Sequence, residues 1–407
     1  MTNRIDVQRV LFTGPSGLSA RIAIEKDDTG RPEAVVTTSG GAKEKSKRFK
    51  HSGYYSELMY ETALDFVIDK ALVHLSKQRF IVKPPQDGAL DFLFPTDVGP
   101  STTNAFAVDE ARGCAWIGDW GVLRRVDLAS GEIRDLSLGD YRDIRDVIVD
   151  VDGRVLIHAL RAEPAKGMWL PPLPPGSSTK QGILRSDGSE LEILVTADGR
   201  LHGAIDPPAC SLALASSGSA GAGAFVGPHD EGLGLYDRAG ELLRRFSVKA
   251  QGTSNAAGAI DPDGGFVVVT SADGKLTRHD LQRGDETTLR GDFAEARQLA
   301  VLADGTTLVL GADYDIHCIG PHGPSGKLGV RATQFSITPD RQSVVVAQHP
   351  QVVTMIDIAT GNARFELTTI GADKPSRAMV VGNHVYARGL LFHRMALPRN
   401  GYGAVVS

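Results

Sequence analysis

A turn signal that returns about every 40 residues is the feature that most constrains how this chain folds. Its clearest copy spans residues 259–284 and contains, in order, a strand, a Pro-Asp-Gly turn, a valine-rich strand, an Asp-Gly turn, a third strand and a D-x-x-x-G turn. Asp-Gly pairs supply the positive φ angles that tight hairpins require. Each copy of the unit therefore predicts four short antiparallel strands.

The first turn of this unit recurs seven times along the chain, at spacings of 36 to 56 residues. Its anchors are Asp109, Asp150, Asp206, Asp261, Leu302, Thr338 and Val381. The D-x-x-x-G turn recurs at 127–131, 280–284 and 357–361, with a shortened form at 237–240. Two insertions, at 163–178 and 215–224, lie within the long spacings. Four strands every 40 residues are typical of a β-propeller blade, so we expect a mainly β chain with about seven blades, six or eight being the alternatives.

One copy carries a resemblance to a known family. Residues 344–347, Val-Val-Val-Ala, followed by Val352 to Gly361, resemble one repeat of the YVTN/WD40-like propeller superfamily. The pattern extends over residues 101–407 and implies the propeller fold. No strand ends in a Trp-Asp dipeptide, so these are not standard WD40 repeats. The resemblance implies no particular activity, because propellers host both binding proteins and enzymes.

The first 84 residues have a different pattern. Strands are predicted at 21–25 and 33–36 around a turn at 27–32, at 45–51 and at 79–82. A helix is predicted over 54–76, where apolar residues recur at steps of three and four. We therefore expect a small α/β domain at 1–84, an antiparallel sheet packed on one helix, then a linker or ring-closing strand at 85–100 and the propeller at 101–407.

This order of elements resembles the WGR domain. The shared outline is the hairpin, the turn at Ser39-Gly40-Gly41, the lysine-rich strand ending at Phe49 and the helix followed by Arg79-Phe80. Thr37-Thr38-Ser39 stands near the place of the defining Trp-Gly-Arg triplet. The resemblance implies a module that in some proteins contacts nucleic acid.

Charge is distributed unevenly between the two parts. Residues 1–84 contain 14 Lys and Arg against 10 Asp and Glu, whereas the remainder contains 30 against 39. A basic N-terminal part followed by an acidic remainder predicts separate partners for the two parts. Three cysteines without C-x-x-C spacing, no apolar signal core at the start and no long apolar run predict a cytoplasmic protein without a membrane segment.

The sharpest candidate binding feature is a basic run in the third predicted strand. Its residues are Lys43, Lys45, Lys47, Arg48 and Lys50. Strand alternation places the first three on one face. Such spread positive charge suits the phosphates of a nucleic acid, with Tyr54 and Tyr55 available for stacking, or an acidic protein surface. The alternative is an edge strand that lysines protect against aggregation.

The first insertion is the second candidate binding feature. It contains Trp169, Leu170, Pro171, Pro172 and Leu173, the start of a proline-rich run that adopts an extended helix. Such a segment at the propeller rim would dock into an aromatic groove of a protein partner, or serve only as a stiff loop. Trp116 and Trp120 are either core residues between blades or part of a rim patch.

No catalytic signature is present, and we assign no catalytic residue, cofactor or metal. Gly323 to Lys327 lacks phosphate-loop spacing and predicts a hairpin turn. The expected function is a binding or scaffold protein, with a protein partner at the propeller rim and a second partner, nucleic acid among the candidates, at the N-terminal domain. The alternative is a propeller hydrolase or lyase with a metal-assisted site built from Asp109, His202, His229, Asp315 and His317. The oligomeric state leaves no trace in the sequence.

Overall fold

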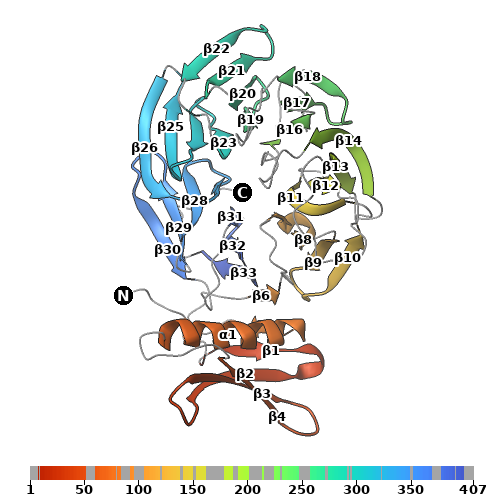
Figure 1. The fold of residues 1–407 in the computed structure, drawn as a ribbon, viewed down its shortest axis with the longest axis vertical. Helices are drawn as coiled ribbons and strands as arrows, with labels where there is room; N and C mark the ends of the chain where they lie inside the picture. Colours follow the sequence, from red (N-terminus) through yellow and green to blue (C-terminus); the bar gives the residue numbers. More distant parts are fainter. Residues whose placement is uncertain are drawn as a thin grey trace. The chain divides into compact units, whose positions relative to one another are not determined.

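A computed structural model gives the fold of the chain (Figure 1). It describes residues 8, 10–51, 60–78, 80–83, 92–95, 105–119, 122–137, 141–149, 153–161, 178–186, 191–200, 213–214, 224–229, 232–246, 257–270, 274–290, 293, 296–321, 323–348, 352–368, 377–389 and 391–397. These residues form eight small antiparallel sheets and one α-helix, so the chain is mainly β as predicted.

The N-terminal sheet has five strands in the order β4-β3-β2-β1-β5. They are β1 Leu11–Thr13, β2 Ser19–Lys26, β3 Pro32–Ser39, β4 Lys45–Lys50 and β5 Ile81–Lys83, and α1 spans Tyr60–Lys77. The predicted hairpin is β2 and β3, which pair in register from Ser19 opposite Ser39 to Lys26 opposite Pro32. The short strand β1, which separates β2 from β5, was not predicted from the sequence.

Seven further sheets have four strands each. Six of them use consecutive strands: β7 to β10 (Phe106–Asp109, Cys114–Asp119, Val122–Asp127, Ile133–Ser137), β11 to β14 (Tyr141–Val149, Val155–Arg161, Ser178–Ser186, Leu191–Arg200), β15 to β18 (Ala213–Leu214, Phe225–His229, Gly232–Tyr236, Leu242–Phe246), β19 to β22 (Gly258–Ile260, Phe266–Thr270, Leu276–Asp280, Glu286–Arg290), β23 to β26 (Gln298–Val301, Thr307–Leu310, Asp315–Gly320, Gly323–Arg331) and β27 to β30 (Phe335–Ile337, Ser343–Gln348, Val352–Asp357, Ala363–Thr368).

The seventh four-stranded sheet joins strands from the two ends of the chain. It consists of β31 (Arg377–Val381), β32 (His384–Arg388), β33 (Leu391–Ala396) and β6 (Phe92–Pro95). β6 pairs antiparallel with β33, with Phe94 opposite Phe392 and Leu93 opposite His393. Residues 92–95 thus form a strand. A ring-closing strand was one of the two predictions for residues 85–100, and a linker was the other.

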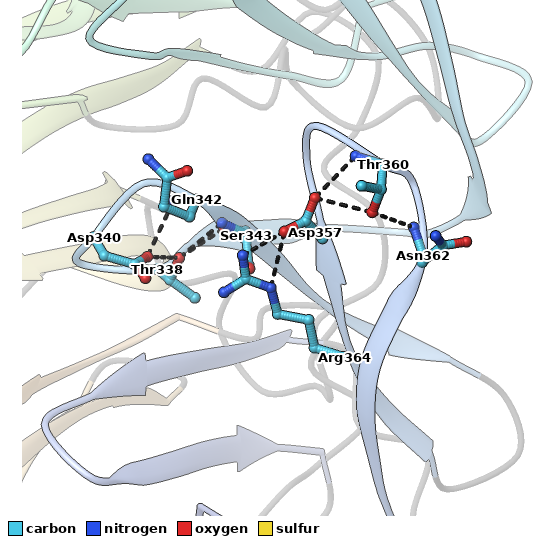
Figure 2. A network of polar contacts seen from close by, with 8 residues as sticks. All are labelled: Thr338, Asp340, Gln342, Ser343, Asp357, Thr360, Asn362 and Arg364. Atoms are coloured by element: carbon cyan, nitrogen blue, oxygen red, sulfur yellow. Dashed lines mark hydrogen bonds and ion pairs between the residues drawn. The ribbon is translucent and has the colours of Figure 1, made fainter. Parts of the chain in front are cut away.

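The repeated turns have the hydrogen bonds that their sequence predicts (Figure 2). In the turn between β29 and β30, the Asp357 carboxylate accepts from the backbone N of Thr360 at 2.9 Å and from Arg364 Nε at 3.0 Å. Gly361, at φ +70°, donates its N–H to the Asp357 carbonyl. The same Gly-to-Asp backbone bond closes the turns at 237–240 and 280–284. The aspartate therefore satisfies the turn's free N–H groups, and the glycine takes its positive φ without steric cost.

The chain divides into two compact units, one of residues 1–98, 128–131 and 335–407 and one of residues 99–127 and 132–334. In the second unit, neighbouring sheets share buried cores in chain order. Trp116 and Leu123 pack with Ile144 and Val155 between the first two sheets, for example. Further cores join the next three sheets in turn. The Ile144 side chain packs closely against the backbone at Gly118, where a Cβ would lie 2.5 Å from Ile144 Cγ2.

In the first unit, the N-terminal sheet, α1 and the sheets β27–β30 and β31–β33–β6 contribute to one continuous core. Val67, Ala71 and Leu75 of α1 are buried in it, and so are Val345, Met355 and Val385. α1 and β5 also lie beside β6. The helix periodicity therefore predicted a buried face of α1, but no sequence pattern indicated that this core extends to the sheet of β31, β32, β33 and β6.

One detail predicted for the repeat was wrong. The segment Gly323 to Lys327 is not a hairpin turn but the beginning of strand β26, and the chain reverses before it, where Gly320 pairs with Gly323. Gly and Pro there mimic a turn signal without forming a turn. The anchor Asp206 lies outside the described residues.

Candidate anion-binding site

The basic run lies on β4, which forms one edge of the five-stranded sheet. β3 is its only neighbour in that sheet, with Val36 opposite Lys47 and Thr38 opposite Lys45. Edge position and lysine content fit the prediction of a protected edge strand. Alternation along β4 then separates its basic residues into two groups with different surroundings.

One group, Arg48 and Lys50, is neutralised within the module. Arg48 Nη1 lies 2.6 Å from Glu25 Oε2 and 3.0 Å from Glu33 Oε2, and Lys50 Nζ lies 2.6 Å from Glu33 Oε1. The Glu33 side chain is only 4% exposed. The hydrogen-bonded ion pairs with Lys50 and Arg48 lower the pKa of Glu33, and the pairing with Glu33 raises the pKa of Lys50. These two cations thus stabilise a buried carboxylate, while their own side chains are 54% and 64% exposed.

The other group, Lys43, Lys45 and Lys47, lines a pocket of about 700 Å³ between β3, β4 and the C-terminal end of α1. Leu18, Val36 and Thr38 are among the other lining residues, together with His74 of α1 and Gln78 directly after the helix. No carboxylate within the described part of the chain forms an ion pair with any of the three lysines. The pocket therefore combines a partly apolar floor with a cationic rim.

His74 forms the wall of the pocket opposite the lysines. Gln78 Nε2 donates to His74 Nε2 at 3.0 Å, and Lys47 Nζ lies 3.5 Å from His74 Nδ1. The ring centroid of His74 is 5.2 Å from that of Phe49. Burial, and secondarily the charge of Lys47, lowers the pKa of His74. His74 is therefore a neutral hydrogen-bonding and stacking group at neutral pH, and the lysines carry the positive charge.

The C-terminal end of α1 at the pocket opposes anion binding. The C-terminus of a helix is equivalent to about half a negative charge. Three ammonium groups without carboxylate partners outweigh that partial charge several-fold. The pocket therefore has a positive field, and it can hold phosphate, sulfate or carboxylate groups by charge-assisted hydrogen bonds.

The other predicted site residues lie elsewhere. Trp169, Leu170, Pro171, Pro172 and Leu173 lie outside the described residues, as do Tyr54, Tyr55 and Trp120. Trp116 is 4% exposed and belongs to the core between two sheets, which confirms its core interpretation.

The residues proposed for a metal centre are engaged with cations where the structure describes them. The Asp109 carboxylate forms an ion pair with Arg112 Nη1 at 2.9 Å. It also accepts a hydrogen bond from the backbone N of Arg112 and thereby caps a short 3-10 helix. Lys327 Nζ lies 2.9 Å from Asp313 and 2.6 Å from Asp315, and His317 lies 3.2 Å from Asp313. Within the described ranges no group of three or more His, Cys, Asp or Glu side chains is arranged to hold a metal. His202 and the side chain of His229 are outside these ranges.

Sequence reasoning missed His74 and Gln78, which complete the pocket from α1. Their signal was present in the helix, because Phe66, Lys70, His74 and Gln78 follow one another at steps of four and so share a face. That face was not recognised because its residues are neither uniformly apolar nor acidic.

No protein-family model and no curated protein matches the sequence. No helix in the described part of the chain has the length and apolar character needed to cross a membrane.

Proposed function

We propose that this chain is a non-catalytic binding protein of the reducing cytoplasm, in which a seven-bladed β-propeller of the YVTN/WD40-like kind carries a WGR-like module that binds a polyanionic partner. The observation that carries the proposal is the pocket with Lys43, Lys45 and Lys47, whose charges no described carboxylate neutralises. A second partner, a protein, would bind at the propeller rim.

Three observations support the propeller. Seven sheets have four antiparallel strands each, and six of them are built from consecutive strands. Within each compact unit, successive sheets share buried cores, as blades do. The pairing of β6 with β33 completes a sheet from an early and a late segment, which is how propellers protect their edges. Cys114 and Cys318 are free thiols, which suits a reducing compartment.

The charge of the pocket is tested with inorganic polyphosphate, which presents closely spaced phosphates without bases or sugars. We expect calorimetric titration at low salt to detect binding that weakens as salt rises, with the logarithm of affinity falling linearly. Lys45→Gln should weaken binding. Arg21→Gln removes the same charge from the exposed opposite face of β2 and should have little effect. Equal losses in both variants, or unchanged binding when all three lysines become Gln, would refute a site at this pocket.

The rim partner is tested by affinity purification of the whole protein with mass spectrometry, with and without nuclease. We expect a protein partner that survives nuclease and is lost on deletion of residues 163–178, while the deleted protein keeps its folded circular dichroism spectrum. Retention of every partner by the deleted protein would exclude this insertion as the contact.

A further inference from the structure

The pocket is one end of a longer surface that runs along the seam between α1 and β4. α1 contacts β4, and the two elements lie in the same module (Figure 1). Beyond the pocket, the seam continues through Phe49 and His74 to His51, Phe66 and Lys70. We call the whole surface the α1–β4 track, formed by Lys43, Lys45, Lys47, Phe49, His51, Phe66, Lys70 and His74.

Rings and cations alternate along this track. Lys47 Nζ lies 5.5 Å from the centroid of Phe49, whose ring is 5.2 Å from that of His74. Toward the other end, the rings of His51 and Phe66 meet edge to face at 5.2 Å. Lys70 Nζ lies 4.2 Å above Phe66. The rings are therefore held in place by neighbours, and an ammonium group lies beside Phe49, His74 and Phe66.

The packing of the module does not explain why the Phe66 side chain is exposed. It is 40% exposed, although Val67 beside it is fully buried. An exposed phenyl ring costs solvation free energy, and its contacts with His51 and Lys70 fix it while leaving 40% of its surface exposed. A preformed aromatic surface next to a cation is what a stacked nucleobase and its phosphate require.

We infer that the α1–β4 track binds single-stranded nucleic acid, with the lysines on the phosphates and Phe66 as the main stacking platform. This inference rests on the proposed polyanion site and extends it to a class of ligand. A single strand is favoured over a duplex because only unpaired bases present a face to stack on. It is favoured over an acidic polypeptide because carboxylates would pair with the lysines, but nothing would stack on the aromatic rings.

The dimensions set the length of the ligand. From His51 to Lys45 the strand advances about 20 Å, and from Phe66 to Gln78 the helix advances about 18 Å. That length suits about four nucleotides, the lower end of known site sizes for single strands.

The test uses the full chain and a fluorescent oligothymidine of about eight nucleotides, roughly twice the expected site. Fluorescence anisotropy should show binding whose salt slope is about −3, because four lysines line the track and each contributes about −0.7 for a single strand. A duplex of the same length should bind more weakly, and polyglutamate should compete poorly.

Variants of Phe66 separate stacking from charge. Phe66→Leu keeps an apolar side chain without a ring and should weaken oligothymidine binding about 5- to 100-fold. Phe66→Tyr keeps the ring and should bind like the natural protein. Neither change should affect the affinity for inorganic polyphosphate. Because Phe66 is exposed, both variants are expected to fold, and circular dichroism checks this.

The outcomes distinguish the two proposals. If Phe66→Leu binds oligothymidine unchanged, or if duplex or polyglutamate binds as tightly as the single strand, the nucleic-acid inference is wrong while the polyanion site stands. If replacing the three lysines leaves polyphosphate binding intact, the polyanion site itself is wrong. If Phe66→Leu weakens oligothymidine alone and the lysine variant weakens both ligands, both proposals hold.

Discussion

The burial of His393 makes the stability of this protein depend on pH in a way that can be calculated. His393 lies on β33, opposite Leu93 of β6 and Ala387 of β32, and is completely buried. Burial lowers the pKa of its imidazole from 6.5 to about 3. The unfolded chain therefore binds a proton at His393 in a pH range where the folded chain does not.

The direction and size of the effect follow from these two pKa values. The stability that depends on neutral His393 is fully present above about pH 6.5 and is lost as the pH falls from there toward 3, because protonation favours the unfolded state. A pH of 5 lies about 1.5 pH units below the pKa of the imidazole in the unfolded chain. At about 1.4 kcal/mol per unit, the free energy of unfolding falls by about 2 kcal/mol between pH 7 and pH 5. A folded pKa of 4 instead of 3 would hardly change this figure.

The measurement compares denaturant unfolding of the natural protein and of His393→Gln at pH 7 and pH 5. Other titrating groups are shared by the two proteins, so the difference between their pH effects isolates His393. All three tryptophans belong to the compact unit without His393, whereas α1 belongs to the unit that contains it. Ellipticity at helical wavelengths therefore follows the unit with His393, and tryptophan fluorescence follows the other.

We expect the natural protein to lose about 2 kcal/mol more than His393→Gln on going to pH 5, in the transition reported by α1. A difference below about 0.5 kcal/mol, well under the calculated effect, would refute the reasoning. It would mean that His393 titrates in the folded protein, and therefore that its imidazole is not fully buried there. If the variant does not fold, an NMR titration of His393 in the natural protein decides the same point.

Three further predictions concern the turns, the sheet contacts and the N-terminal module. Arg341 adopts φ +57° in a turn where the neighbouring repeats have glycine, so Arg341→Gly should raise the free energy of unfolding by about 0.5 kcal/mol, and a lower value in urea unfolding would contradict this. Gly118→Ala places a methyl group 2.5 Å from Ile144 Cγ2, so it should destabilise the protein by about 1–3 kcal/mol by tryptophan-monitored unfolding, and an unchanged midpoint would show that the two sheets are not in contact. The ion pairs that lower the pKa of Glu33 give stability that is fully present above the ordinary glutamate pKa of 4.5 and is lost as the pH falls from there through the lower pKa of the folded protein. Glu33→Gln should therefore flatten the acid limb of thermal unfolding, and an identical limb would refute the pairing.

Much of the local structure could be predicted from the sequence. The turns at 280–284 and 357–361 combine an aspartate that bonds free N–H groups with a glycine that tolerates positive φ, and both effects act within five residues. The apolar period of α1 and the alternation along β4 are equally local. The same reasoning failed at Gly323 to Lys327, where glycine and proline occur in a strand, because pairing with β25 decided the conformation.

Half of the candidate site could be predicted, and the other half could not. Alternation grouped Lys45 and Lys47 on one face of β4, with Lys43 just before the strand, but it could not show which cations were already neutralised. That depended on Glu33, which the sheet register places opposite Lys50. The approach of His74 to Lys47 likewise depends on how α1 packs across the sheet.

The sequence by itself determined a chain of four-stranded units with defined turns and a basic edge strand, because φ preferences, side-chain alternation and apolar periods are properties of neighbouring residues. Only the tertiary structure decided that β6 pairs with β33, that the side chain of His393 on β33 is buried, and that Arg48 and Lys50 are paired while the other three lysines line a pocket. These outcomes depend on contacts between residues distant in the chain, whose free energies come from burial and charge pairing in the folded protein.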